Sequence, residues 1–443
     1  MESSVYSLLP QIRGLRSLVI GFPKNKQLTF LDTSQNMIPF PYAAFTTNHH
    51  GSKPDISVSF PGKPLRVGDW QQIAMVMEAK SSSDQDPFPR QGTTHADTII
   101  QLTVSARNLM VAHGLLAVFI LGIYGDDVRI ARFDHSCVVV SKPFSLRQSN
   151  HLLRQFFWRF SHPVNAKIPF VGWDPTICKL SAALLRTLKK RLEHAGMEVP
   201  ADLSKARRAL VYESETSTRC KAYILFKLLD VNSRLFSRAT MVWVAVEDNA
   251  ELYDPKVPLT RVIVKESWRQ IIRTSEKEFY QRLDRIPDNL RIGLPRLLYG
   301  GNLGERAVAQ WKVQGGCIYY DDDGDVLSAA GDSGLKDASS SSPSFLSSSS
   351  FNSSSLSDDS VPDVPLPFPK QQTFTWRSSR GQDKAYYERS HMRFVTDIVG
   401  RPLTDFRSTQ ELVTAMRDAI IGEVSHPTQL RRHLTHFSTQ ATS

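Results

Sequence analysis

Two spacings of apolar residues recur along the chain, and they predict a mixture of strands and helices. Short β-branched or alternating runs are typical of strands, and they occur at 55–60, 73–77, 115–124, 128–133, 137–140, 222–229, 241–246, 261–265, 294–299 and 392–399. Apolar residues three or four apart are typical of helices, and they occur at 96–113, 150–160, 175–195, 275–283 and 409–421. Residues 13–22 are expected to hold one further short strand. The pattern therefore favours an α+β fold.

Changes in composition divide the chain into parts. Residues 1–200 are expected to form a mixed α/β domain, and residues 205–300 a second, strand-rich region. Residues 301–385 are rich in serine and proline, and such a segment buries too little apolar surface to offset its chain entropy. We therefore expect a disordered insertion there. Order is expected to return at 386–422, and the polar residues 423–443 are expected to form an unstructured tail.

The charge and the cysteines exclude several classes of protein. A net charge of +10 over 443 residues favours solubility and tolerance of anionic partners, but no basic block interleaved with aromatic residues points to nucleic acid. The 4 cysteines have no CxxC spacing, so neither zinc nor a disulfide framework is expected. A reducing, intracellular compartment is favoured, without distinguishing cytoplasm from nucleus. The apolar run 115–123 is too short to cross a bilayer, so no membrane partner is expected.

One segment combines a strand, a lysine and a helix. The β-branched run 262–264 predicts a buried strand, and Lys265 follows it directly. Ser275 and Glu278 have the spacing of a capping box, which predicts that a helix begins there and carries Glu276. In protein kinases a strand lysine holds ATP phosphates, and a glutamate of the next helix holds the lysine. This segment is similar to that arrangement; a solvated lysine beside a charged helix face is the alternative.

A longer segment carries a closer resemblance. The sequence FVTDIVGRPLTDFRSTQELVTAMRDAI at 394–420 resembles the hinge and the following helices of the fungal-type protein kinases. The segments VIVKESWR and SEKEFYQRL resemble the lysine strand and the regulatory helix of the same family. The domain that precedes the kinase in this family is similar to residues 78–133. The resemblance implies a partial protein-kinase fold in the second half of the chain, with an N-lobe, a hinge and the first C-lobe helices.

The resemblance also implies roles for individual residues. Lys265 would bind the phosphates of ATP and Glu276 would hold the lysine, with Glu278 as the second choice for that role. Thr396 would gate the pocket behind adenine. The backbone of Asp397–Val399 would form the hinge that hydrogen-bonds adenine.

The same comparison implies that phosphoryl transfer is missing. Where kinases have glycines above the phosphates, this chain has Ser237-Arg238-Ala239-Thr240, and without glycine the backbone approaches phosphate less closely. The sequence contains no His-Arg-Asp and no Asp-Phe-Gly, whose aspartates orient the nucleophile and hold Mg²⁺. We therefore expect a Ser/Thr-kinase-type chain, truncated before the catalytic loop, with weak or no ATP binding, no Mg²⁺ at this site and no transferase activity. A non-enzymatic scaffold or decoy of a full-length kinase is an alternative, and no protein partner follows from the sequence.

A second group of charged residues lies in the first domain. Asp55 is expected on a strand, and Glu78 and Lys80 end the next clear strand, two residues apart and so on the same face. This arrangement, followed by a helix with Gln101, resembles the core of restriction endonucleases. The resemblance implies that the carboxylates hold a divalent metal and that the lysine stabilises the attacking water or the phosphate. A metal-dependent nuclease is thus an alternative function, although a strand end with solvated charges accounts for the same residues and is favoured.

Overall fold

The computed structural model describes the two strand-rich parts of the chain and several shorter segments. The described residues are 8–66, 68–88, 93–214, 217–271, 273–285, 287, 295–304, 370–373, 388–397 and 406–424, with four two-residue strands between 312 and 327. The insertion expected at 301–385 and the tail expected at 423–443 therefore lie largely outside them. Within the described ranges, no helix has both the length and the apolar character that crossing a membrane requires.

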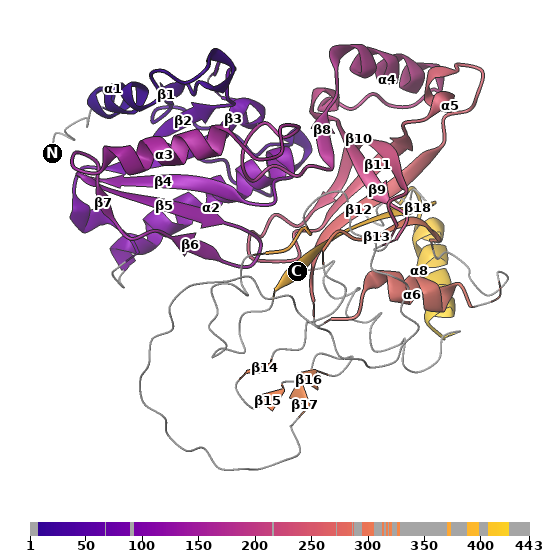
Figure 1. Cartoon of the computed structure of the whole chain (residues 1–443). Helices are drawn as coiled ribbons and strands as arrows, with labels where there is room; N and C mark the ends of the chain where they lie inside the picture. The colour runs from indigo at the N-terminus through magenta and orange to yellow at the C-terminus, as the bar shows by residue number, and fades with distance from the viewer. Residues whose placement is uncertain are drawn as a thin grey trace.

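Two seven-stranded sheets organise the described residues (Figure 1). The first sheet has the order β1-β2-β3-β4-β5-β6, with β7 beside β5. The elements of this part are α1 (Leu9–Leu18), β1 (Phe30–Asp32), β2 (Ile56–Ser59), β3 (Ile73–Lys80), α2 (Thr93–His113), β4 (Val118–Tyr124), β5 (Asp127–Phe133), β6 (Val138–Val140), β7 (Phe144–Ser145) and α3 (Asn150–Ser161). The pair β3–β4 is parallel because the long helix α2 connects the two strands. β3 is buried along almost its whole length, which is typical of a central strand.

The helix α1 replaces a strand that the sequence analysis expects at 13–22, and that expectation is wrong. Ile12, Leu15 and Leu18 are buried at three-residue spacing, so they share one face of a helix. Pro10 lies in the first turn, where a helix tolerates proline. A short apolar run does not by itself distinguish the helical period from the strand period.

The second sheet has the order β13-β18-β12-β11-β10-β9-β8, and its neighbouring strands are antiparallel. Its strands are β8 (Ile177–Lys179), β9 (Arg207–Tyr212), β10 (Cys220–Val231), β11 (Met241–Glu247), β12 (Arg261–Gln270), β13 (Leu297–Asn302) and β18 (Arg389–Thr396). The helices of this part are α4 (Ala182–His194), α5 (Ala250–Tyr253), α6 (Glu276–Leu283) and α8 (Thr409–Val424). β18 comes from late in the chain, yet it lies between β12 and β13.

Short elements complete the described structure. The 3₁₀ turns are η1 (Lys24–Lys26), η2 (Ala43–Phe45), η3 (Trp70–Gln72), η4 (Ser83–Gln85) and η5 (Leu203–Lys205). Two small hairpins pair β14 (Lys312–Val313) with β15 (Gly316–Cys317) and β16 (Tyr319–Tyr320) with β17 (Val326–Leu327). Residues 370–373, inside the expected insertion, pack beside β18, where Gln371 is buried.

Both faces of the second sheet are covered. Alternate residues of β12 belong to two different hydrophobic cores, one on each face. Val264 belongs to the core that joins this sheet to the first part of the chain, with Phe40, Tyr42, Trp243 and Val395. Ile263 belongs to the core on the opposite face, with Leu188 and Leu192 of α4 and Val244 of β11. The sheet therefore lies between the first part of the chain and α4.

The second sheet begins earlier in the chain than the composition suggests. The helix expected at 175–195 is divided, because Ile177–Lys179 form the edge strand β8 beside β9. α4 starts only at Ala182, where Oγ of Ser181 accepts from the backbone N–H of Leu184 at 3.2 Å. Residues before the expected boundary near 200 thus contribute a strand and a helix to the second sheet.

Candidate functional site

Lys265 and Glu276 form an ion pair beside the second sheet. Lys265 lies on β12, and its Nζ is 2.7 Å from Oε1 of Glu276 in the first turn of α6. α6 begins with a capping box, in which Ser275 accepts from the backbone N–H of Lys277 and the side chain of Glu278 accepts from Ser275. Of the two candidate partners of Lys265, Glu278 is therefore engaged at the helix cap, and Glu276 is the one that contacts the lysine. The side chain of Lys265 remains 21% exposed, so a ligand can reach it.

The residue expected to gate the pocket lies next to the lysine strand. Thr396 ends β18 opposite Ile263 of β12, and Ile263 is two residues before Lys265 on the same face. Asp397 follows, and its Oδ1 accepts from the backbone N–H of Arg296 at 2.8 Å. The structure therefore places Thr396 and Asp397 beside the strand that carries Lys265. The third hinge residue, Val399, lies outside the described residues.

A buried group of four charged residues, which the sequence pattern does not predict, joins the second sheet to the first part of the chain. Arg393 is fully buried, with Nη2 2.7 Å from Glu266 and 3.1 Å from Asp174. Arg207 contacts Glu266 at 2.9 Å. Burial raises the pKa of Glu266, but the charges of Arg207 and Arg393 outweigh it and lower the pKa to about 2. The signal in the sequence is a glutamate and an arginine within two apolar strands, which burial allows only as partners.

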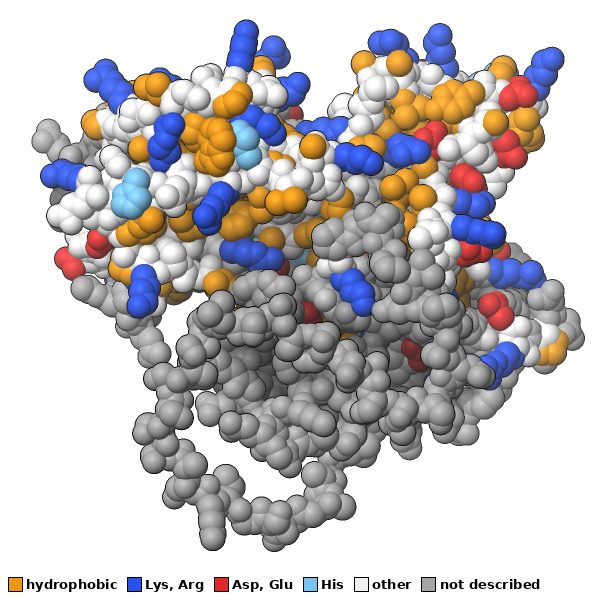
Figure 2. All heavy atoms as spheres, viewed as in Figure 1, with side chains coloured by type: hydrophobic (Ala, Val, Ile, Leu, Met, Phe, Trp, Pro, Cys, Tyr) orange, Lys and Arg blue, Asp and Glu red, His pale blue; other side chains and the backbone are white. Residues whose placement is uncertain are grey.

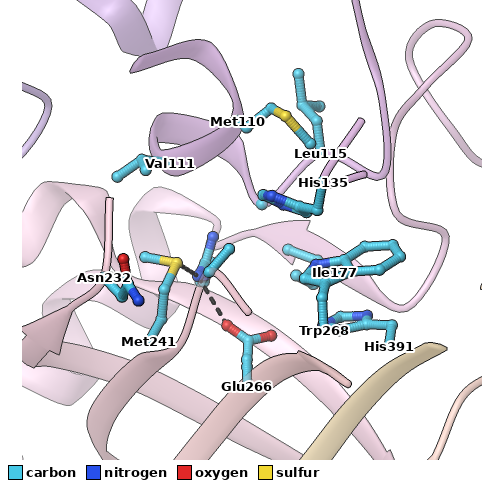
Figure 3. Close-up of a pocket in the computed structure, with 13 residues that line it drawn as sticks. Met110, Val111, Leu115, His135, Ile177, Asn232, Met241, Glu266, Trp268 and His391 are labelled. Carbon is cyan, nitrogen blue, oxygen red and sulfur yellow. Dashed lines mark hydrogen bonds and ion pairs between the residues drawn. The ribbon is translucent and has the colours of Figure 1, made fainter. Parts of the chain in front are cut away.

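A small cavity lies beside this network, between α2 and β12 (Figure 3). It has a volume of about 40 Å³, and Val111, Trp268 and His391 are among the residues that line it. Burial lowers the pKa of His391 to about 4, so the ring is neutral at pH 7. The cavity has room for roughly one to three water molecules and none for a nucleotide. Trp268 faces it, whereas Lys265 lies on the opposite face of β12, so the cavity is separate from the Lys265 site.

The structure also brings together the charged residues of the first part. Asp55 precedes β2, and its Oδ2 accepts from the backbone N–H of Ala79 at 2.8 Å. Glu78 and Lys80, on β3, form an ion pair in which Glu78 is buried and Lys80 partly exposed. Burial and the neighbouring charge of Asp55 raise the pKa of Glu78 to about 7, although Lys80 acts in the opposite direction. Asp55, Glu78 and Lys80 therefore form one cluster, as their positions on the two strands predict.

The donors in this cluster are two carboxylates. Gln101, on α2, donates to the carbonyl of Lys53 at 3.3 Å rather than to either acid. In the described parts of the chain, no group of three or more His, Cys, Asp or Glu is placed to hold a metal ion. Two carboxylates suit Mg²⁺, which commonly keeps several water ligands and takes one or two protein carboxylates. Asp55 and Glu78 are thus the two carboxylates that a cation bound at this cluster would have as protein ligands.

The basic side chains of the visible surface are dispersed. On the face shown in Figure 2, the Lys and Arg side chains of the described residues are spread over both parts of the chain. Apolar and uncharged side chains separate them. Proteins that bind nucleic acid by charge present a basic patch or stripe, and the coloured, described residues of this view form none.

Comparison with protein families identifies the chain. The family model described as fungal protein kinase matches residues 62–427. Because the match covers most of the chain, the chain belongs to the fungal protein kinase family, and the resemblance found at 262–283 and 394–420 is confirmed at this level. The match includes Lys265 and Glu276 and also Glu78 in the first part, whereas Asp55 precedes it. No curated protein and no solved structure matches the chain.

Proposed function

We propose that this chain is a kinase-like nucleotide-binding protein that holds ATP weakly at Lys265. The single observation that carries the proposal is the 2.7 Å contact between Lys265 on β12 and Glu276 on the following helix. In active kinases a strand lysine holds the α- and β-phosphates of ATP, and a glutamate of the following helix holds that lysine. The position of β18 next to β12 supports the proposal further, because it brings Thr396 and Asp397 to the edge where adenine would bind.

We also propose that these 443 residues do not transfer phosphate by themselves. Transfer needs one aspartate to orient the nucleophile and another to hold Mg²⁺. The sequence has neither the His-Arg-Asp nor the Asp-Phe-Gly motif that supplies them. Binding is weak because Ser237-Arg238-Ala239-Thr240 replace the glycines that let a backbone approach phosphate.

Replacing Lys265 with alanine is expected to weaken ATP binding about tenfold or more, because a charge-assisted contact to phosphate is lost. Isothermal titration of the full chain with ATP measures this. Lys256→Ala, at an exposed lysine of a loop, is the matched control and is expected to leave the affinity unchanged. Equal affinities of wild type and Lys265→Ala would remove the proposed site. Phosphorylation of any substrate above the Lys265→Ala level would remove the second part of the proposal.

A second candidate function is a metal-dependent hydrolase of the nuclease type, and one observation favours it. Asp55 lies beside Glu78 and Lys80 in the fold, although 22 or more residues separate Asp55 from these two in the sequence. Asp55 and Glu78 would hold the cation, and a bound Mg²⁺ would supply an activated water. Lys80 is placed to stabilise the water or a phosphate oxygen once it leaves Glu78. DNA cleavage that requires Mg²⁺ and is lost in Glu78→Ala would establish this activity.

The cluster is expected to make stability depend on pH. The pKa of Glu78 is raised from 4.5 to about 7 in the folded chain, so the contribution of Glu78 to stability is fully present below about pH 4.5 and is lost as pH rises through 7. The shift corresponds to about 3 kcal/mol. Glu78→Gln should therefore melt at a higher temperature than wild type at pH 8, and at a similar temperature at pH 5.

Metal binding is expected to remove this difference. Excess Mg²⁺ at pH 8 should raise the melting temperature of the wild type and leave that of Glu78→Gln unchanged, because only the carboxylate binds the cation strongly. Glu193→Gln, at an exposed position of α4, controls for the loss of one negative charge. A wild type that does not respond to Mg²⁺, Mn²⁺ or Ca²⁺ would count against a metal site.

A further inference from the structure

The loop 232–240 joins β10 to β11, and it is fixed to the first part of the chain. Leu235 is buried in the core of that part, and its carbonyl accepts from Nδ1 of His135 at 2.9 Å. A 3.0 Å hydrogen bond joins Oγ of Ser233 to Nδ1 of His49. Residues outside the second sheet therefore hold in place the loop that, in a kinase, covers the phosphates.

The backbone at the tip of this loop is occupied by internal hydrogen bonds. The carbonyl of Arg238 accepts from the backbone N–H of Trp268 at 2.7 Å, and the N–H of Ala239 donates to Oγ of Ser237 at 3.0 Å. Ala239 has φ +41°, a left-handed conformation that alanine rarely adopts. A glycine-rich loop binds phosphate through its backbone N–H groups. The N–H of Ala239 already has an acceptor, so this donor is not available to a phosphate.

The side chain of Arg238 reaches the Lys265–Glu276 pair. Nη2 of Arg238 is 3.9 Å from Oε2 of Glu276, while Nζ of Lys265 is 2.7 Å from Oε1. Oε2 is buried and makes no hydrogen bond within the described residues. Among the described residues the guanidinium of Arg238 makes this long contact with Glu276, and its side chain is 41% exposed, so it can turn towards a ligand.

We propose that Arg238 is a second phosphate-binding residue, which acts with Lys265 in place of a glycine-rich cradle. The ligand class is a polyphosphate chain, and its identification as the phosphates of ATP rests on the function proposed above. Arg238 and Lys265 both carry a positive charge and lie on either oxygen of the Glu276 carboxylate, so phosphate oxygens would be attracted to the same place. Binding is therefore expected without Mg²⁺, and the polyphosphate contributes more to it than the nucleoside does.

The test is titration of the full chain in EDTA with ATP, inorganic tripolyphosphate and adenosine. Arg238→Ala is expected to weaken the binding of ATP and tripolyphosphate about tenfold or more and to leave any binding of adenosine unchanged. Arg238→Lys should recover part of the loss, since it keeps the charge. Arg234→Ala is the matched control, because Arg234 is an exposed arginine of the same loop; it should change the affinity less than about twofold. Melting temperatures of all variants report whether the fold is intact.

The outcomes separate this proposal from the function on which it rests. ATP binding that depends on Lys265 and is equal in wild type and Arg238→Ala overturns the role of Arg238 and leaves the nucleotide site standing. Tripolyphosphate binding that depends on Arg238, in a chain that does not bind ATP, overturns the nucleotide site and supports the anion site. A wild type that binds neither compound overturns both. If Arg238→Ala and Arg234→Ala lose the same affinity, the loss comes from the lower overall charge of the chain. That result overturns a specific contact between Arg238 and phosphate.

Discussion

Replacing Arg393 with methionine is expected to destabilise the folded chain by about 3–5 kcal/mol, the cost of breaking a buried ion pair from one side. The guanidinium is fully buried and contacts Glu266, Asp174 and the hydroxyl of Thr176. Its loss leaves Asp174 and Glu266 with less compensation in a buried site. Urea denaturation followed by tryptophan fluorescence measures the loss, since Trp243 and Trp268 lie in the same sheet.

The control for this variant is Arg261→Met, which makes the same change at an exposed position of β12. Surface replacements of this kind usually change the free energy of unfolding by less than about 0.5 kcal/mol. If Arg393→Met is no more harmful than Arg261→Met, the buried network does not stabilise the contact between the two parts. If the double variant Arg393→Met/Glu266→Gln is more stable than Arg393→Met alone, the loss of stability comes from the buried carboxylate of Glu266, which has lost its partner Arg393.

Replacing Gly300 with alanine is expected to cost about 3 kcal/mol or more. Gly300 lies in β13 with φ +124°, a conformation that L side chains rarely adopt. A Cβ there would collide with the carbonyl oxygen of Arg393 and lie 2.8 Å from Cα of Phe394. Both atoms belong to the backbone of β18, so neither can turn away as a side chain would. The measurement is chemical denaturation, with hydrogen exchange of 389–396 to locate the loss.

Gly14→Ala is the matched control for this prediction. Gly14 lies inside α1, and a Cβ there meets no atom within 4 Å. Alanine is the better helix former, so this variant should gain roughly 0.5–1 kcal/mol. Equal stability of Gly300→Ala and wild type would show that β13 does not need the close approach to β18.

The sequence predicts many of the strands where apolar residues follow one another or alternate, as in β3, β4 and β5, but it misses β9 and the short strands β1, β7 and β8. It also predicts the capping box of α6, because Ser275 and Glu278 act within a single turn. The pairing of Lys265 with Glu276 follows from the same local chemistry, together with the resemblance to kinases. The prediction fails at α1, where the short apolar run 18–20 favours a strand although Ile12, Leu15 and Leu18 have the spacing of one helix face.

Contacts between distant segments lie beyond what local patterns predict. Nothing at Leu235 indicates that it enters the core of the first part, where its carbonyl accepts a hydrogen bond from His135, 100 residues away in the chain. The network of Arg207, Glu266 and Arg393 likewise joins three segments, and each charge becomes tolerable only when the others are present. The sequence offers the charged residues, whereas their partners follow from the way the two parts pack.

Because β8 and α4 belong to the second sheet although they precede residue 200, the two halves of this protein cannot be exchanged independently. Recombination between genes near codon 200 would separate Ile177–Lys179 from the edge of β9 and leave that edge open to pairing with other chains. It would also expose Val264 and Trp243, whose partners Phe40 and Tyr42 would come from a different parent. The two parts are therefore expected to be inherited together, with their interface changing only through matched substitutions on both sides.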